Sequence, residues 1–282
     1  MRSWHPARSV GGAWDEGWRG LVRGTRRPYG QGMTAADAPG RPGWLLDQVA
    51  SAGRENLDAG HVARYDAIED AAPDREVALL QRWGMDGDSV VVELGTGTGQ
   101  FALAAARVCG RVVAVDVSPV MIAELEAKLR RSGLENVTVV QAGFLDYQHQ
   151  GPPADVVYSR YAMHHLPDFW KGVALARIRD ALRPGGVLRV WDVVWSFEVH
   201  EAEERLEAWC ATGGPDGGDG WSRADFEEHV RDEHSTFTWL FEALAERAGL
   251  VLETAEYSAD GVFAEYVFSR PDGPVPETAD SD

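Results

Sequence analysis

The pattern with the clearest chemical meaning is the glycine-rich turn ELGTGTGQ at residues 93–100, which follows an apolar run that begins at Ser89. Glycine lets a bound cofactor approach backbone that a side chain would block. Asp116 closes the next apolar run, 19 residues after Gly97. A carboxylate in that position accepts hydrogen bonds from the ribose of a nucleotide-like cofactor. The combination predicts a cofactor site at the ends of two neighbouring strands.

The details of the turn favour S-adenosylmethionine (SAM) over a dinucleotide. A dinucleotide fingerprint requires a third glycine where Gln100 stands. Glu93 can face the cationic amino group of SAM, whereas it would repel a pyrophosphate. A short-chain dehydrogenase also needs a lysine four residues after its tyrosine, and here Tyr161 is followed by His165 at that spacing. We therefore expect SAM, with a nicotinamide dehydrogenase as a distant alternative.

The elements that must position these residues alternate between apolar runs and helical patterns. Helical patterns at 101–108 and 119–131 separate the first apolar runs. The predicted strands are 89–94, 112–117, 137–141, 155–159 and 186–193. Near-continuous, valine-rich strands of this kind indicate a parallel sheet covered on both faces. Right-handed crossovers make such a sheet doubly wound, so the fold class is α/β.

The alternation stops after residue 193. Helical patterns at 198–211 and 222–231 predict a helical lid inserted at about 196–235. A helix at 238–248 and strands at 250–257 and 262–269 follow, with a hairpin turn between the two strands. The sheet is therefore expected to end with an antiparallel strand.

The sequence resembles class I SAM-dependent methyltransferases over about residues 60–270. Besides the glycine turn, the matching motifs are VAVDVS at 113–118, HHLPD at 164–168 and LRPGG at 182–186. The resemblance is greatest to the small-molecule branch around quinone-biosynthesis and natural-product methyltransferases. It implies a Rossmann-like, doubly wound, seven-stranded sheet in the order 3-2-1-4-5-7-6, with the last strand antiparallel.

The resemblance also implies the contacts of the cofactor, with Asp116 on the ribose and Gly143 and Phe144 on one face of the adenine. The full set expected is Tyr65, Glu93, Gly95, Thr96, Gly97, Gly99, Asp116, Val117, Met121, Gly143, Phe144 and Ser159. The commoner family pattern has an acid at position 144, which binds the adenine amine. Phe144 can stack on the ring but cannot accept that bond, so Asp146 or the backbone of 142–143 would have to replace it.

The candidates for catalysis are His164, His165 and Asp192. The two histidines follow the predicted strand 155–159 at its carboxyl end, where ligands bind in an open parallel sheet. Methyl transfer requires an acceptor lone pair about 3 Å from the methyl carbon, and histidine is the usual base near neutral pH. In O-methyltransferases of the family an acid after strand five joins such a histidine, and Asp192 matches that position. A purely structural role in a loop stays open for each of the three.

The candidates for substrate binding are Arg160, Tyr161, Trp195 and Phe197. Arg160 and Tyr161 would orient a polar or anionic acceptor, and Trp195 and Phe197 would flank the mouth of the cofactor site on the lid side. The two aromatic side chains favour a partly apolar or aromatic substrate.

The histidine spacings elsewhere predict no metal. The segment at 200–204, HEAEE, begins like a zinc-binding H-E-x-x-H motif but lacks the second histidine. His229 and His234 are five residues apart, which misses the one-turn spacing of a helix face. These residues are interpreted as solvated helix surface, and the mechanism as metal-free.

Composition limits the partners and the compartment. Acidic residues outnumber basic ones by 45 to 27 in 282 residues, and this excess argues against a nucleic-acid partner. The sequence contains no stretch of about 20 apolar residues that would span a membrane. Two cysteines, Cys109 and Cys210, cannot form a disulfide framework, so we expect a cytoplasmic protein.

Four segments are expected. Residues 1–32 are rich in arginine and are interpreted as a disordered or mis-assigned leader, with an ordinary start at Met33. Residues 33–86 form an N-terminal helical cap, 87–270 the SAM-binding domain with its lid, and 271–282 a disordered acidic tail.

The sequence therefore predicts a SAM-dependent methyltransferase that acts on an O, N or C atom of a small molecule and releases S-adenosylhomocysteine. Two alternatives remain: SAM-dependent cyclisation or aminocarboxypropyl transfer, which yields methylthioadenosine, and a non-catalytic SAM-binding protein. A homodimer is possible, and the substrate is not readable from the sequence.

Overall fold

The computed structural model describes residues 42–53, 56–62, 65–69, 71–215 and 220–273. The predictions for 1–32, for a start at Met33 and for the tail from 274 onward lie outside these residues. The chain divides into two units, Met1–Asp47 and Gln48–Asp282. Of the first unit only 42–47 are described, with a turn at 43–44. Everything below concerns the second unit.

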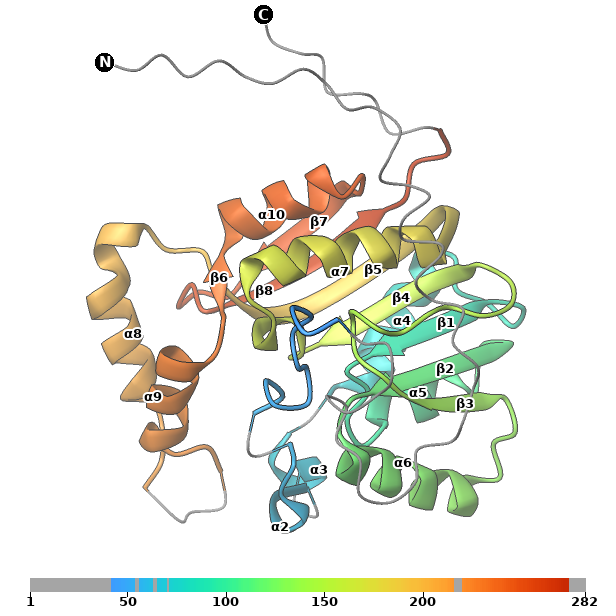
Figure 1. The fold of residues 1–282 in the computed structure, drawn as a ribbon, viewed down its shortest axis with the longest axis horizontal. Helices are drawn as coiled ribbons and strands as arrows, with labels where there is room; N and C mark the ends of the chain where they lie inside the picture. Colours follow the sequence, from blue (N-terminus) through green and yellow to red (C-terminus); the bar gives the residue numbers. More distant parts are fainter. Residues whose placement is uncertain (1–41, 54–55, 63–64, 70, 216–219, 274–282) are drawn as a thin grey trace, which may run out of the picture. The chain divides into compact units, whose positions relative to one another are not determined.

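A single mixed sheet forms the centre of this unit (Figure 1). Its strands are β1 (Val90–Leu94), β2 (Arg111–Asp116), β3 (Val137–Gln141), β4 (Ala154–Arg160), β5 (Leu182–Trp195), β6 (Thr236–Phe237), β7 (Val251–Tyr257) and β8 (Phe263–Ser269). The main path runs β3-β2-β1-β4-β5-β8-β7, and only β8 is antiparallel to its neighbours. The predicted order is confirmed. Sequence analysis missed β6, because two residues beside the end of β5 are too short for a strand pattern.

Alternate residues of each strand feed two cores on opposite faces of the sheet. One face packs against α4 (Pro73–Arg82), α5 (Gln100–Ala105) and α6 (Pro119–Ser132), through buried residues such as Val91 and Val112. The other face packs against α7 (Asp168–Ala181) and α10 (Thr238–Arg247), which contact each other. On this face the Phe241 ring of α10 stacks on Tyr266 of β8, with centroids 5.4 Å apart. The layered architecture expected of a doubly wound sheet is present.

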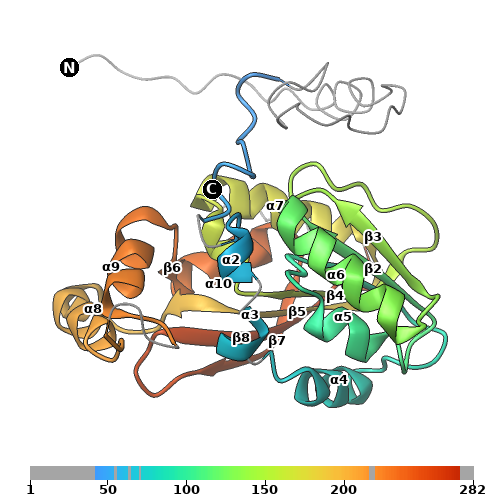
Figure 2. The ribbon, with the colours of Figure 1, turned by 90° about the horizontal axis from the view of Figure 1, so that it is seen from below.

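The lid lies beyond the carboxyl end of β5. It contains the short helix η3 (Val199–Glu201), α8 (Ala202–Cys210) and α9 (Arg223–Asp232). Figures 1 and 2 both show α8 and α9 at the side of the molecule opposite β3. Ser222 begins α9 through a reciprocal capping box with Asp225, as its spacing predicts. The lid is attached to the sheet by β6 and by a buried cluster that includes Trp195, Phe197 and Trp209.

Within the predicted N-terminal cap, the described residues include the short helices α2 (Ala59–Val62) and α3 (Tyr65–Ile68). No helix in the described part of the chain is long and apolar enough to cross a membrane.

The glycine turn is held in place by β2. The amides of Gly95 and Thr96 both donate to the carbonyl of Val115, at 2.9 and 3.0 Å. Gly95 has φ +76°, and a Cβ there would lie 2.3 Å from the Cβ of Ala162. Both the left-handed conformation and the close approach therefore require glycine at this position.

We predict that Gly95→Ala lowers the unfolding free energy by about 2–5 kcal/mol, because it adds a steric overlap to the cost of the left-handed conformation. Gly133→Ala is the matched control: its φ is +71°, but a Cβ there meets nothing within 4 Å. It should cost only about 1–2 kcal/mol. Urea unfolding measures both, and equal losses would contradict the role assigned to the contact with Ala162.

Candidate functional site

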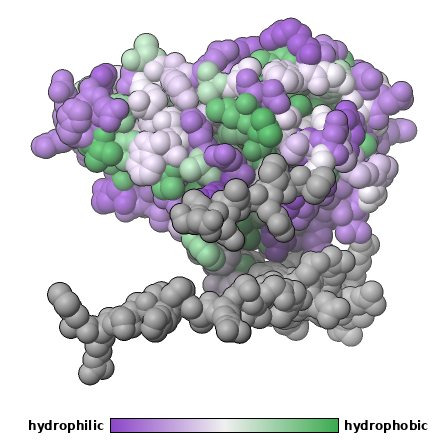
Figure 3. Space-filling view, turned by 90° about the horizontal axis from the view of Figure 1, so that it is seen from above, coloured by the Kyte–Doolittle hydropathy of each residue, from purple (hydrophilic) through white to green (hydrophobic). Residues whose placement is uncertain are grey.

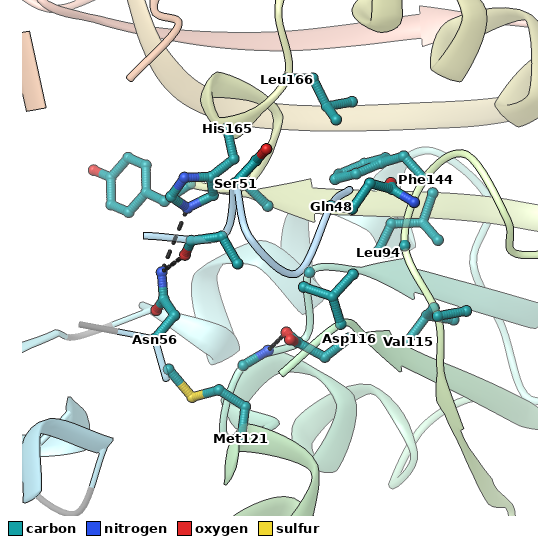
Figure 4. A pocket seen from close by; sticks show the side chains of 18 of the residues that line it. Gln48, Ser51, Asn56, Leu94, Val115, Asp116, Met121, Phe144, His165 and Leu166 are labelled. Atoms are coloured by element: carbon teal, nitrogen blue, oxygen red, sulfur yellow. Dashed lines mark hydrogen bonds between the residues drawn. The ribbon is translucent and has the colours of Figure 1, made fainter. Parts of the chain in front are cut away.

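A first cavity lies at the carboxyl ends of β1 and β2, where the glycine turn and Asp116 meet (Figure 4). Eight of the predicted cofactor contacts line it: Tyr65, Gly95, Gly97, Asp116, Val117, Met121, Gly143 and Phe144. The Asp116 carboxylate accepts from the amides of Gly97 and Ser118, both at 2.8 Å. Burial raises the pKa of Asp116, and these two amides oppose the shift. Asp116 is therefore fixed at the cavity wall.

The other four predicted contacts lie behind the wall instead of lining it. The carboxylate of Glu93 is buried and accepts from the Thr96 hydroxyl at 2.6 Å. Gly99 caps α5 in a left-handed conformation, and Ser159 is completely buried in β4. In this structure these residues shape the turn and the strand end that support the cavity.

The N-terminal segment forms a wall that the sequence analysis missed. Gln48, Ser51, Ala52 and Asn56 all line the first cavity. The hydroxyl of Ser118 donates to the Asn56 carbonyl at 2.6 Å, which fastens this segment to the start of α6. No motif marks it in the sequence, because its contacts depend on residues 62 to 109 positions away.

Gln48 binds the residues next to position 144, where the commoner family pattern has an acid. Its amide donates to Asp146 at 3.1 Å, and its carbonyl oxygen accepts from the Leu145 amide at 3.0 Å. Asp146 in turn accepts from the Gly143 amide at 2.6 Å. A Cβ on Gly143 would lie 2.4 Å from the Gln48 side chain, so the glycine makes room for it. Asp146, expected as a replacement for the missing acid, is thus occupied by protein partners.

His165 stands where the first cavity meets a second one. Asn56, Tyr65, Tyr161 and His165 line both cavities. The Nε2 of His165 lies 3.4 Å from the Asn56 amide, and Figure 4 shows the two side chains pointing toward each other. Burial and the neighbouring His164 lower the pKa of His165 to about 3. His165 is therefore a neutral imidazole at the junction.

His164 is bound to Asp192, as the sequence analysis anticipated. His164 belongs to the short helix η2 (Met163–His165), and its Nδ1 lies 2.5 Å from an Asp192 oxygen. Asp192 also accepts from the amides of Met163 and Val193, both at 2.8 Å. Burial lowers the pKa of His164, but the carboxylates of Asp192 and Glu233 outweigh burial and raise it. Asp192 lines neither of the two described cavities, so it acts on the site through His164.

The second cavity has a volume of about 440 Å³ and lies between the strand ends and the lid. Its aromatic walls are Tyr65, Tyr161, Trp209, Trp221, Phe226 and Phe263. Its polar walls include His164, His165, His229 and Glu233, and the acids Asp58, Glu69, Asp225 and Glu228. Its size falls within the range of roughly 300–1,000 Å³ that is typical of small-molecule sites.

One interpretation of the sequence is wrong here. His229 was expected at a solvated helix surface, yet the side chains of His229 and of nearby Glu233 are only 13% and 16% exposed and face His164. His200 and His234 are exposed, as expected. The available signal was the four-residue spacing of His229 and Glu233, which places both on one face at the end of α9.

The predicted substrate contacts divide into two pairs. Tyr161 lines both cavities, and Arg160 lines the first while its guanidinium stacks on Tyr161 at 4.3 Å. Burial raises the pKa of Tyr161 to about 12, so its phenol stays neutral. Trp195 and Phe197, in contrast, pack in the core beneath the lid and are absent from the described walls of both cavities. The hydrophobic cluster with Trp209 accounts for their position.

The central part of the chain is similar to known methyltransferases. Residues 91–186 match the family profile described as "Methyltransferase domain". An uncharacterized methyltransferase of Geobacillus sp. (strain WCH70) is 31% identical over 133 residues, which is 45% of this chain and 61% of the relative. The chain spans 50%, 61% and 64% of the length of three curated relatives that it matches.

Solved structures agree on the fold. The [4+2]-cyclase SpnF is 16% identical with a TM-score of 0.54, covering 71% of this chain and 82% of that one. The magnesium protoporphyrin IX methyltransferase from Synechocystis PCC 6803 with bound S-adenosylhomocysteine is 13% identical with a TM-score of 0.52, covering 77% and 86%. The chain has the fold of class I SAM-dependent methyltransferases. Residues 91–186 match a methyltransferase domain, and the resemblance to class I SAM-dependent methyltransferases that the motifs predicted is confirmed.

We predict that Glu93 makes the stability of the fold depend on pH. Burial raises the pKa of Glu93 to about 8. Between about pH 4.3, where the unfolded chain ionises, and pH 8 the unfolded state has lost a proton that the folded state keeps. The unfolding free energy therefore falls as pH rises through this window, by up to about 1.4 kcal/mol per unit, and levels off above it.

The measurement compares urea unfolding of the wild type and Glu93→Gln from pH 5 to 9. The wild type should lose stability relative to the variant as pH rises to 8. Glu135→Gln, at an exposed position, serves as the control and should follow the wild type. If the wild type and Glu93→Gln gave parallel profiles, the raised pKa would be refuted.

Proposed function

We propose that this chain transfers a methyl group from SAM to a small molecule, with the cofactor in the first cavity and the acceptor in the second. The observation that carries the proposal is the meeting of the two cavities at His165 and Tyr161, directly beyond the glycine turn. Methyl transfer needs such an arrangement, because the acceptor must reach the methyl carbon in line with the bond that breaks.

The residues of the first cavity fit SAM. The missing Cβ of Gly95 leaves backbone at the wall, and the fixed carboxylate of Asp116 offers acceptors for ribose hydroxyls. Phe144 and Met121 provide apolar surface for the adenine. SAM, when bound, supplies an electrophilic methyl group on its sulfonium. In our proposal Tyr65 covers the methionine end, since it lines both cavities.

The first cavity must widen to admit the cofactor. Its volume of about 70 Å³ is far below the roughly 300–1,000 Å³ of small-molecule sites. Gln48, Ser51, Ala52 and Asn56 narrow it from the N-terminal side. We infer that this segment moves outward when SAM binds and then closes over it, excluding water from the reacting atoms.

The second cavity suits an acceptor that is partly aromatic or apolar. Its aromatic walls would bury the body of such a molecule, while Tyr161 and Arg160 orient a polar group near the cofactor. We propose that His165 contacts the acceptor where the two cavities meet. Asp192 orients His164 so that His164 can also contact the acceptor. The volume of the second cavity, about 440 Å³, favours a small-molecule acceptor over a macromolecule.

Two further features bear on the setting of the protein. Cys109 and Cys210 are buried and free, which supports the proposal of a reducing, cytoplasmic compartment.

Phe169 on α7 and Trp239 on α10 are 70% and 60% exposed. Figure 3 shows hydrophobic side chains gathered near the middle of the face seen from above Figure 1, the side on which α7 and α10 lie. A homodimer through this face stays a prediction.

We predict that the full chain binds S-adenosylhomocysteine and that Asp116→Asn weakens this binding at least about tenfold, because charged hydrogen bonds to the ribose are lost. Asp74→Asn, at an exposed position on α4, is the control and should bind like the wild type. Calorimetric titration measures all three proteins. Binding of NADH in place of S-adenosylhomocysteine would overturn the cofactor assignment.

The reaction itself is tested by product analysis. Incubation with SAM and a panel of small aromatic hydroxyl, amine and thiol acceptors should yield S-adenosylhomocysteine and a methylated acceptor, detected by mass spectrometry. Methylthioadenosine as the product would instead support cyclisation or aminocarboxypropyl transfer. Tight cofactor binding without either product would favour a non-catalytic SAM-binding protein.

A further inference from the structure

We propose that His164, His229 and Glu233 bind one divalent transition-metal ion at the wall of the second cavity. Binding of the ion stands on the geometry of these residues alone. Only its role in the reaction rests on the proposed function. The proposal departs from the metal-free mechanism expected from the spacing of His229 and His234.

The three side chains come together from distant parts of the chain. Their ligand atoms all lie within 4.8 Å of one another. Oε2 of Glu233 lies 3.2 Å from Nε2 of His164 and 2.5 Å from Nδ1 of His229. His164 comes from η2, which follows β4, and the lid supplies His229 in α9 and Glu233 directly after it. The cluster therefore joins the sheet side of the cavity to the lid.

Each imidazole uses one nitrogen for a protein partner and presents the other to the cluster. His164 binds Asp192 through Nδ1 at 2.5 Å, which leaves Nε2 facing Glu233. His229 binds the Ser235 hydroxyl through Nε2 at 2.7 Å, which leaves Nδ1 facing the same carboxylate. Metal-binding histidines characteristically have such an outer partner, because it fixes the tautomer and the ring orientation.

The contacts within the cluster are close, but their geometry leaves one carboxylate oxygen without an aligned hydrogen-bond donor in the described part of the chain. Oε2 of Glu233 is buried and has no hydrogen-bond partner among the described residues, although two imidazole nitrogens lie near it. Buried carboxylate oxygens normally have a partner. A cation bound between the three side chains would satisfy this oxygen and both nitrogens together.

The donor set limits the kind of ion. Two imidazoles and one carboxylate suit Zn²⁺, Fe²⁺ or Co²⁺, whereas Mg²⁺ and Ca²⁺ prefer oxygen ligands. Three protein ligands leave a coordination position open, as in catalytic zinc sites. All three residues line the second cavity, so the open position faces the space assigned to the acceptor.

This placement deepens the proposed function by naming the acceptor group. An acceptor hydroxyl or thiol bound to the ion would lose its proton to water more readily, because the metal lowers the pKa of a coordinated O–H or S–H group. The acceptor would then reach the junction at His165 as an anion. We therefore infer an oxygen or sulfur acceptor with an aromatic or apolar body.

The test uses the untagged full chain, stripped of metal by dialysis against a chelator and titrated with Co²⁺ and Zn²⁺. We expect one ion per chain by calorimetry and a visible absorption spectrum of four- or five-coordinate Co²⁺. The double variant His229→Asn/Glu233→Gln should abolish saturable binding. Asp192→Asn, which removes the negative charge of the outer partner, should weaken it about 10–100-fold. His234→Asn is the matched control, since this exposed neighbour lies outside the cluster.

Circular dichroism and urea unfolding establish that each variant is folded, independently of cofactor binding and of any turnover. If the folded wild type bound Co²⁺ no better than the folded double variant, the metal site would be refuted and the cluster would be a network of polar contacts. If the wild type bound the ion and the variant did not, the site would be established even if no methyl transfer were found. A failure of the proposed methyl transfer would therefore leave the outcome of the metal-binding test unchanged.

Discussion

Parallel pairing of β1, β2, β4 and β5 forces their carboxyl ends onto one edge of the sheet, and the glycine turn, Asp116 and the histidine pair all depend on that edge. The register sets Leu94 beside Val115 and Ser159 beside Val190. The glycine turn, Asp116 and the histidine pair consequently open toward one region. Backbone pairing thus determines where chemistry can occur before any side chain is considered.

Buried carboxylates at the strand ends convert this edge into defined loops. Glu93 binds the Thr96 hydroxyl, Asp116 binds the amides of Gly97 and Ser118, and Asp192 binds Met163 and His164. A buried polar group without a partner would be costly there, so each of these acidic side chains fixes the backbone that follows a strand. The acid that the sequence assigned to catalysis, Asp192, therefore acts by holding His164 toward the lid. A single set of interactions supports both the fold and the site.

The sequence predicts the parts of the site that lie within a few residues of a strand end. The glycine turn and Asp116 belong to this group, because each follows from local pattern and the topology of parallel sheets. The strand order and the pairing of His164 with Asp192 were predicted from the family resemblance instead. The contribution of Gln48 and of His229 with Glu233 could not be predicted in this way. Each meets its partners only after distant segments have packed, and no local pattern encodes that packing. Trp195 and Phe197 show the converse: aromatic residues near a site can serve the core.

The central claim is that the first cavity holds the cofactor and the second holds the acceptor. A crystal structure of the full chain with S-adenosylhomocysteine tests it most directly. The account predicts the ribose on Asp116, the adenine against Phe144, the sulfur end toward Tyr161 and His165, and the segment around Gln48 and Asn56 displaced from its present position. Density for the ligand in the second cavity, or its absence from the region of Asp116 at saturating concentration, would contradict the account.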